Sequence, residues 1–355
     1  MTEKKILVAM SGGVDSAVAA YLINSQGFET AGITMKLWSE KEEVHDSDCD
    51  LPDENAKDAK KITDALGIPH FCVSFGDSFK KCVINNFFED YKNGYTPNPC
   101  VECNKNIKFG VLYDKAVSLG YNTLATGHYA RIEKNEEGYF LRCAVDSAKD
   151  QTYFLWRLQK ELLSHIMFPL GERTKDEIRA IADANGFSNA HRKDSQDICF
   201  IPDGDYVSFI RKYGDIPEIP GNYVDLSGNV IGRHEGIIRY TVGQRKGLGV
   251  AFGQPMFVGA KDASSNTVTL CTDRELYSKE IIASNINIFS KALFEKEVRL
   301  LAKIRYRHTP APATVELISE DRMRVIFDEA QRAPTPGQSI VLYDGDILVG
   351  GGIIK

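Results

Sequence analysis

Short apolar runs alternate with amphipathic segments through the first 200 residues of the chain. Residues 6–10 are apolar throughout and predict a buried strand, and residues 15–26, which end at Gly27, predict a helix. The same patterns predict strands over 30–35, 68–74 and 123–126, and helices over 53–66, 105–119 and 174–185, the last opened by a capping box at Thr174. This alternation predicts an α/β fold with a doubly wound, Rossmann-like parallel sheet.

The pattern changes near residue 205, where glycine, proline and period-2 alternation take over. Residues 224–259 are rich in turns, and residues 298–307 alternate apolar side chains with a mostly basic face formed by Lys303, Arg305 and Arg307. Further strands are predicted over 314–318, 323–327 and 339–354. We therefore predict a catalytic domain over 1–205, a small β-rich linker domain over 206–278 and a C-terminal antiparallel β-barrel over 279–355.

Composition and charge narrow the functional classes. A chain of 355 residues is longer than one hydrophobic core usually grows, and its apolar and charged fractions are those of a globular protein. The net charge of -6 argues against indiscriminate coating of nucleic acid, so an RNA partner requires a local basic patch. The sequence has neither a signal-peptide pattern nor an 18-residue apolar run, which predicts a cytoplasmic protein that does not engage a membrane.

Residues 11–16 read SGGVDS directly after the first predicted strand. Gly12 and Gly13 permit a sharp turn that brings backbone N–H groups close to an anion, and the following helix points its positive end at the same place. The loop lacks the lysine of the Walker P-loop. It resembles instead the loop of the PP-loop ATP pyrophosphatases, which implies ATP with Mg²⁺ as cofactor. The simpler alternative is a tight turn in an ordinary βα unit.

Five further stretches point to one family. They are TPNPCVECNKNIKFG (96–110), ATGHYAR (125–131), KDQTYFLWRL (149–158), DSQDICFI (194–201) and YTVGQRKGLG (240–249). Together they resemble the tRNA-specific 2-thiouridylase family (MnmA/TrmU) over the whole chain. The resemblance implies ATP-dependent 2-thiolation of the wobble uridine in the anticodon stem-loop of tRNA, with glutamate, glutamine and lysine acceptors. It also implies a persulfide donor, such as a cysteine desulfurase or a sulfur-relay protein.

The resemblance implies the site residues position by position. Cys103 and Cys199 would be the catalytic pair, with Cys199 carrying a persulfide. The ATP site would comprise Ala9, Met10, Ser11, Gly12, Gly13, Val14, Asp15, Ser16, Met35 and Gly127. The target base would meet Asn98, Pro99 and Cys100, and other parts of the tRNA would meet His128, Lys149, Asp150, Gln151, Arg305, Tyr306 and Gln338.

The chemistry of thiolation calls for this combination independently. The C2 oxygen of uracil leaves only after conversion to an adenylate, which ATP cleaved at the α–β bond provides. A persulfide then supplies nucleophilic sulfur, and a second thiolate releases that sulfur by disulfide exchange. Cys103, at the start of a predicted helix, is expected to have a lowered pKa. The base must also leave the anticodon stack.

Cys100 departs from the family pattern, which has aspartate at this position. Cys100, Cys103 and Cys199 together could hold a 4Fe-4S cluster with one open iron, Cys100 and Cys103 could form a redox disulfide, or Cys100 could simply fill space. The persulfide relay is the first hypothesis, and it needs no metal.

Simpler interpretations stay open for other residues. Cys199 could be a core thiol, His128 could be structural rather than an RNA contact, and the basic strand face could be solvated. We interpret the remaining cysteines as core filler: Cys49, Cys72, Cys82, Cys143 and Cys271. Two other functions also fit the glycine loop, namely a PP-loop ligase such as an argininosuccinate or NAD synthetase, and a non-enzymatic RNA-binding protein that senses nucleotide.

Overall fold

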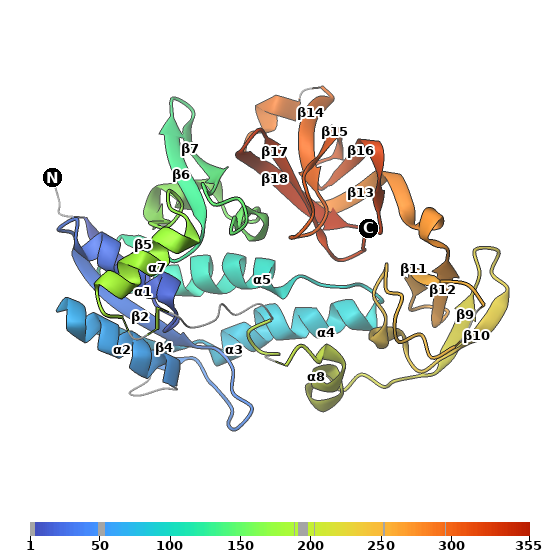
Figure 1. Cartoon of the computed structure of the whole chain (residues 1–355), viewed down its shortest axis with the longest axis horizontal. Helices are drawn as coiled ribbons and strands as arrows, with labels where there is room; N and C mark the ends of the chain where they lie inside the picture. Colours follow the sequence, from blue (N-terminus) through green and yellow to red (C-terminus); the bar gives the residue numbers. More distant parts are fainter. Residues whose placement is uncertain are drawn as a thin grey trace. The chain divides into compact units, whose positions relative to one another are not determined.

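A computed structural model of the chain describes residues 4–48, 54–187, 189–190, 198–201, 203–250, 253–294 and 296–355. Its contacts divide the chain into two compact units (Figure 1). The first unit contains residues 1–83, 100–200 and 346–348, and the second contains 84–99, 201–345 and 349–355. Both units are therefore assembled from separate stretches of the chain.

A parallel sheet forms the centre of the first unit, with strand order β3-β4-β2-β1-β5-β8. Its strands are β1 (Lys5–Ala9), β2 (Glu29–Lys36), β3 (Ser47–Asp48), β4 (His70–Ser74), β5 (Thr123–Thr126) and β8 (Ile166–Met167). All neighbours pair in parallel except β3, which is antiparallel to β4. When the parallel strands alone are counted in chain order, β1, β2, β4, β5 and β8 become strands 1 to 5, and their order in the sheet is the Rossmann order 3-2-1-4-5. In such a sheet, ligands bind at the carboxyl ends of the first and fourth strands. In this chain those strands are β1 and β5.

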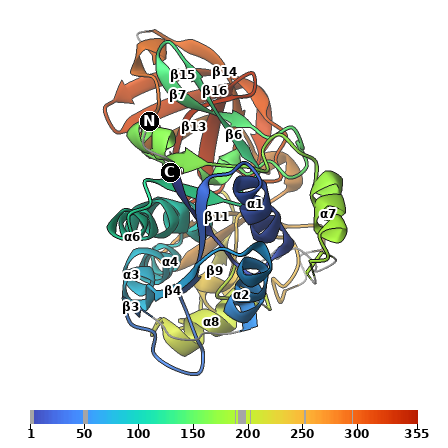
Figure 2. The same cartoon turned by 90° about the vertical axis from the view of Figure 1, so that its left-hand side faces the viewer.

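Helices cover both faces of this sheet. Figure 2 shows α6 on one side of the sheet and α1 and α2 on the other. The helices of the unit are α1 (Val14–Asn24), α2 (Glu54–Leu66), α3 (Gly76–Phe79), α5 (Pro99–Glu102), α6 (Leu112–Ser118) and α7 (Lys175–Ala184), with a π-helical segment (Cys103–Val111) between α5 and α6. The predicted capping box is present, since Thr174 accepts a hydrogen bond from the Glu177 amide and Glu177 accepts one from the Thr174 amide.

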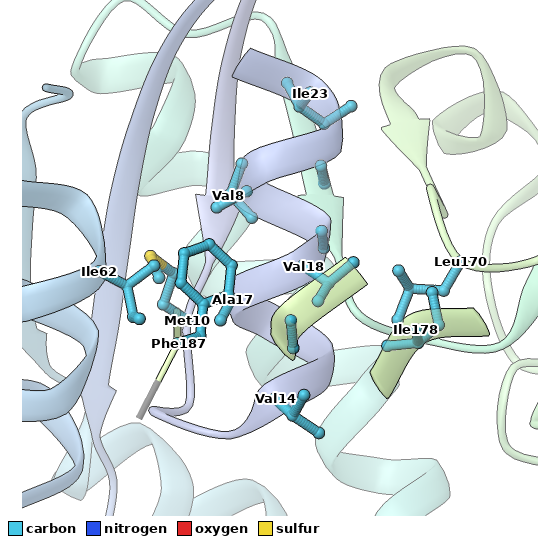
Figure 3. Packing of buried hydrophobic residues seen from close by; sticks show 14 of the residues in the cluster. Val8, Met10, Val14, Ala17, Val18, Ile23, Ile62, Leu170, Ile178 and Phe187 are labelled. Carbon is cyan, nitrogen blue, oxygen red and sulfur yellow. The ribbon is translucent and has the colours of Figure 1, made fainter. Parts of the chain in front are cut away.

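The core of the first unit surrounds α1. Figure 3 shows α1 with Met10, Ile62 and Phe187 on one side and Leu170 and Ile178 on the other. Most of the residues of α1 are buried, which is expected of a helix covered by a sheet on one face and by other helices elsewhere. This burial fixes the start of α1, and therefore the loop that precedes it.

A hairpin of β6 (Ala130–Asn135) and β7 (Gly138–Cys143) follows β5. It is followed by 3₁₀ turns at Thr152–Phe154 and Lys160–His165. No local pattern predicts this hairpin, because its mostly half-buried strands carry many charged and polar residues and lack the apolar run of a buried strand.

The second unit begins with α4 (Asn85–Lys92), reached through a π-helical turn (Lys80–Ile84). α4 packs its aromatic side chains on α8 (Tyr206–Tyr213), with ring centroids of Phe88 and Phe209 5.7 Å apart and those of Tyr91 and Tyr206 5.0 Å apart. A small sheet of order β10-β9-β12-β11 follows. Its strands are β9 (Gly221–Val224), β10 (Val230–His234), β11 (Phe257–Asp262) and β12 (Thr267–Cys271), with 3₁₀ turns at Ile237–Arg239 and Asp273–Leu276.

The remainder of the second unit is an antiparallel barrel. Its strands are β13 (Tyr277–Ile288), β14 (Val298–Lys303), β15 (Ala311–Ser319), β16 (Arg322–Arg332), β17 (Ser339–Asp344) and β18 (Ile347–Ile354), and a 3₁₀ turn (Lys291–Phe294) precedes β14. They are ordered β13-β16-β15-β14-β17-β18, and pairing of β13 with β18 closes the barrel. Closure removes the free sheet edges and encloses an apolar core.

The predicted fold class is confirmed, with a parallel sheet first, a small β-rich part next and a closed barrel last. Two local predictions are wrong. β14 ends at Lys303, because a turn closed by a hydrogen bond from the His308 amide to the Arg305 carbonyl (3.0 Å) interrupts the alternating strand. The helix predicted over 105–119 begins earlier, at Pro99, and is kinked at Gly110. The domain boundaries at 205/206 and 278/279 stay predictions.

Candidate nucleotide and thiol site

The glycine loop joins β1 to α1. Gly12 has a φ of 73°, and a Cβ on it would lie 2.4 Å from the backbone oxygen of Asn55. Ser16 holds the loop together, since its hydroxyl donates to the Gly13 carbonyl (3.0 Å) and accepts from the Ser11 amide (3.2 Å). Only glycine fits the position of Gly12. The loop therefore has the tight backbone shape of a phosphate cradle at a helix N-terminus.

Gly127 approaches the loop from the end of β5. A Cβ on Gly127 would lie 3.0 Å from the carbonyl carbon of Asp15 and 3.1 Å from the amide of Ser16. Its missing side chain therefore lets β5 end directly beside the start of α1. The fold thus brings most of the predicted ATP residues, Ala9 to Ser16 and Gly127, to one place, and Met35 lies at the end of β2, the neighbour of β1.

A lysine from a distant helix reaches the loop. Lys175, the first residue of α7, is 5% exposed, and its Nζ lies 2.8 and 2.9 Å from the two carboxylate oxygens of Asp15. The Tyr129 hydroxyl donates to the same carboxylate at 2.8 Å. No sequence pattern indicates this role for Lys175, because it stands 160 residues after Asp15 and carries no signal beyond its place at a helix start. The fold thus brings a buried lysine to the loop, where it pairs with Asp15.

Cys100, Cys103 and Cys199 form a thiol cluster in the first unit, and all three are free thiols. Cys100 and Cys199 are exposed and Cys103 is buried, and the three lie within electrostatic reach of one another. The fold therefore brings together two cysteines that stand far apart in the sequence. Among the described residues, no three His, Cys, Asp or Glu side chains are arranged as metal ligands. The iron–sulfur alternative stays a hypothesis.

The prediction of a lowered pKa for Cys103 is wrong. Desolvation raises its pKa to about 12, and desolvation also raises the pKa of Cys199 to about 11 and that of Cys100. Cys103 does not stand at a helix start, since the turn Pro99–Glu102 precedes it, so the helix dipole has no free terminus there. The unliganded thiols are therefore protonated at neutral pH.

His128 is buried beside Lys108. Its Nδ1 lies 2.6 Å from the Thr126 hydroxyl and its Nε2 lies 3.2 Å from Nζ of Lys108. Burial, and to a smaller extent the charge of Lys108, lowers the pKa of His128 well below 6.5, which keeps the ring neutral. These contacts agree with the structural interpretation of His128, and a contact with RNA stays a prediction.

The segment Lys149–Gln151 is anchored by its own side chains. The buried carboxylate of Asp150 accepts hydrogen bonds from the Ala144 amide (3.0 Å) and the Thr152 hydroxyl (2.7 Å). The side-chain oxygen of Gln151 accepts from the Tyr129 amide at 3.0 Å. Asp150 and Gln151 therefore fix the loop, while the half-buried Lys149 supplies its positive charge.

The other predicted tRNA residues belong to the second unit. The side-chain amide of Gln338 donates to the carbonyls of Thr96 (2.8 Å) and Pro97 (3.1 Å), and so holds the backbone directly before Asn98 and Pro99. Arg305 and Tyr306 lie in the turn after β14 and are half-buried, and Nζ of Lys303 lies 5.5 Å from the Tyr306 ring centre. The three-residue basic face predicted on this strand is therefore divided between a strand end and a turn.

The interpretation of the remaining cysteines as core filler is wrong for Cys72, which is in a disulfide. Cys82, Cys143 and Cys271 are not disulfide-bonded, and only Cys271 of these three is fully buried. Cys49 lies outside the described residues. Within the described residues, no helix combines the length and apolarity that a membrane crossing needs.

The strand order and the glycine loop define a Rossmann-like protein with a phosphate-binding loop. The sequence profile of the family described as "tRNA methyl transferase HUP domain" matches residues 4–203, and profiles described as "tRNA methyl transferase PRC-barrel domain" and "Aminomethyltransferase beta-barrel domain" match residues 208–272 and 278–354. The chain belongs to the family of the tRNA-specific 2-thiouridylases MnmA.

Two relatives show how far this similarity extends. The tRNA-specific 2-thiouridylase MnmA of Clostridioides difficile is 46% identical over 99% of this chain and 98% of its own. The protein of the same name from Acetivibrio thermocellus is 47% identical over 100% of both chains. Among solved structures, NMN synthetase from Francisella tularensis aligns with 55% of this chain and 67% of its own, with 15% identity and a TM-score of 0.33, and no argument rests on this likeness.

Proposed function

We propose that this protein thiolates the wobble uridine of tRNA at C2, with ATP as the activating substrate. One observation carries the proposal: a single unit of the fold contains both the glycine loop and the free thiols of Cys103 and Cys199. Members of the family that are at least 44% identical carry the name tRNA-specific 2-thiouridylase, which supports the same reaction here.

ATP binding is assigned to the switch point of the parallel sheet. The amides around Gly12 and Gly13 and the N-terminus of α1 provide donors for phosphate oxygens, and Lys175 supplies a buried positive charge beside them. Both oxygens of Asp15, the carboxylate of the loop, are paired with Lys175, so Mg²⁺ would be held mainly by the phosphate oxygens of ATP. When bound, Mg²⁺ neutralises the charge that develops on the departing pyrophosphate.

The sulfur step uses the two cysteines in sequence. The C2 oxygen of uridine attacks the α phosphorus of ATP, pyrophosphate leaves, and the base becomes an adenylate. The terminal sulfur of a Cys199 persulfide attacks C2, and AMP leaves with the former oxygen. The Cys103 thiolate then attacks Sγ of Cys199, which breaks the S–S bond to the base and releases the electron pair onto the sulfur at C2. The Cys103–Cys199 disulfide is returned to two thiols by a thiol reductant, and a persulfide donor reloads Cys199.

The thiol cluster separates this function from its rivals. A PP-loop ligase activates a carboxylate or ureido group for ammonia and needs no cysteines, and methyl transfer, which the family descriptions name, needs no paired thiols either. A protein that only senses nucleotide would release no pyrophosphate. Sulfur transfer is the function that uses the loop and the thiols together.

The experiment compares purified wild-type protein with three single variants, Cys103→Ser, Cys199→Ser and Cys271→Ser. Each is incubated with tRNA, ATP, Mg²⁺, a persulfide donor and a thiol reductant, and 2-thiouridine and pyrophosphate are quantified. We expect thiolation by the wild type and by Cys271→Ser, whose buried thiol lies in the second unit and serves as the matched control. We expect none from the other two. Full thiolation by either active-site variant, or no tRNA-dependent pyrophosphate release by the wild type, would overturn the proposal.

The role of Cys100 is tested with the same assay. The persulfide relay predicts that Cys100→Ser retains thiolation and that protein purified without oxygen is active without iron. A stoichiometric iron–sulfur cluster, lost in Cys100→Ser together with activity, would replace the relay with the cluster mechanism.

A further inference from the structure

The thiol cluster presents a physical problem for the proposed reaction. Sulfur reacts as an anion, whereas desolvation raises the pKa of all three thiols, of the buried Cys103 and also of Cys100 and Cys199, which keep solvent-accessible surface. A cation close to the sulfurs would offset this penalty. Among the residues that the structure describes, Lys108 is the one cation whose charge lowers the pKa of Cys100, Cys103 and Cys199 alike.

The helix geometry places Lys108 near Cys103. Both residues lie in the π-helical segment Cys103–Val111. A π-helix closes its backbone hydrogen bonds between residues i and i+5, so Lys108 follows Cys103 by about one turn of this segment. In an α-helix, by contrast, residues five apart do not share a face, since neighbours on the surface are three and four apart. The π register therefore gives Lys108 and Cys103 neighbouring positions on one surface of the helix.

His128 fixes the ammonium group in this position. An ammonium group can only donate, so Nε2 of His128 accepts the hydrogen bond from Lys108 and the ring proton resides on Nδ1, where it faces the Thr126 hydroxyl. The ring also packs against Phe109 and Phe168, with centroid distances of 5.8 and 5.7 Å. A neutral, packed acceptor holds the lysine without cancelling its charge.

The other charged groups near this helix are directed elsewhere. Arg157 pairs with Glu102. The charges that shift the pKa of Lys105 are those of Arg157 and Glu102, and not those of the thiols. Lys105 is two residues from Cys103 in sequence but does not act on the thiol cluster, which makes it a matched control for Lys108.

We propose that Lys108, held by His128, is the counter-ion of the sulfur anions in this site. It stabilises the thiolates of Cys103 and Cys199, and, if the proposed function holds, the persulfide anion on Cys199. His128 is then a positioning residue for Lys108. This role requires no contact between His128 and tRNA.

The test measures thiol reactivity, so it needs neither tRNA nor ATP and is separate from the test of the proposed function. Alkylation of Cys199 by iodoacetamide is followed by peptide mass spectrometry between pH 6.5 and 10 in the wild type and in Lys108→Met, Lys108→Arg, Lys105→Met and His128→Asn. Cys199 is chosen because solvent reaches it, whereas Cys103 is buried.

We expect Lys108→Met to slow alkylation of Cys199 at pH 8 by about tenfold, equivalent to a rise of about one unit in its apparent pKa. Lys108→Arg should restore most of the rate, His128→Asn should give an intermediate rate, and Lys105→Met should match the wild type. A general loss of structure would instead speed alkylation, because an unfolded chain exposes every thiol. An unchanged pH profile in Lys108→Met, or an equal effect of Lys105→Met, would overturn the proposal.

Discussion

The buried pair of Lys175 and Asp15 makes a quantitative prediction about stability. The Lys175 side chain is 6% exposed and that of Asp15 is 31% exposed, so the two charges differ in their access to water. Removing one member of a buried pair costs about 3–5 kcal/mol when the remaining charge stays buried. Asp15→Asn leaves the ammonium group buried without this counter-charge, and we expect a loss of about 3 kcal/mol in the free energy of unfolding.

Lys175→Met should cost less, about 1 kcal/mol, because the remaining carboxylate reaches water and keeps its hydrogen bond from Tyr129. The double variant should be more stable than Asp15→Asn alone, because methionine removes the buried charge that asparagine leaves uncompensated. The two changes are therefore expected to be strongly non-additive, with a coupling of about 2 kcal/mol.

Urea unfolding followed by tryptophan fluorescence measures these differences. The chain has two tryptophans, Trp38 and the fully buried Trp156, and both lie in the same unit as the pair. The fluorescence transition therefore reports the unit that carries the substitutions. Equal losses for the two single variants, or additive losses in the double variant, would refute the reasoning.

Three further predictions follow from individual residues. Gly12→Ala should abolish ATP binding measured by calorimetry, and it should lower the free energy of unfolding by more than Gly27→Ala does. Both glycines have a positive φ, but only at Gly12 would the new Cβ lie 2.4 Å from a backbone oxygen. The pKa of His128 in the folded protein lies below its unfolded value near 6.5, so the unfolded chain binds a proton first as the pH falls. The free energy of unfolding should therefore decrease below about pH 6.5, by up to about 1.4 kcal/mol per pH unit. Unfolding measured at pH 7.5 and 5.5 should show a smaller decrease in His128→Asn than in the wild type. In filter-binding titrations, Arg305→Ala should reduce the slope of the logarithm of the tRNA-binding constant against the logarithm of the salt concentration by about one. Arg324→Ala should leave this slope unchanged, because the Arg324 side chain is paired with Glu316. Equal slopes for Arg305→Ala and the wild type would show that Arg305 does not contact a phosphate.

Elements with a strong local pattern could be predicted from the sequence. β1, α1 and β5 follow from an unbroken apolar run, from a glycine that ends a helix and from a short apolar strand, and the structure agrees within two residues at each end. The glycine loop was predictable for the same reason, because its backbone shape depends on Gly12 itself. Each of these signals lies within about a dozen residues.

The rest depends on tertiary contacts that no local pattern encodes. Lys175 meets Asp15 only because α7 packs on α1, and Lys108 neighbours Cys103 on the helix surface because that segment adopts a π register. The raised pKa of Cys103 depends likewise on burial by distant parts of the chain, which outweighs its place in a helix. Long-range packing therefore determined the electrostatics of the site, while the local sequence determined its backbone.

The interleaving of the two units has a consequence for synthesis on the ribosome. α4 belongs to the second unit but emerges before most of the first unit, and the aromatic rings of α8 that cover it are made about 120 residues later. At translation speeds of about 5–20 residues per second, Phe87 and Phe88 wait roughly 6–24 seconds for Phe209. During that interval the rings of α4 lack the packing partner that α8 gives them in the folded unit. Neither unit can be produced intact by cutting the gene at one point.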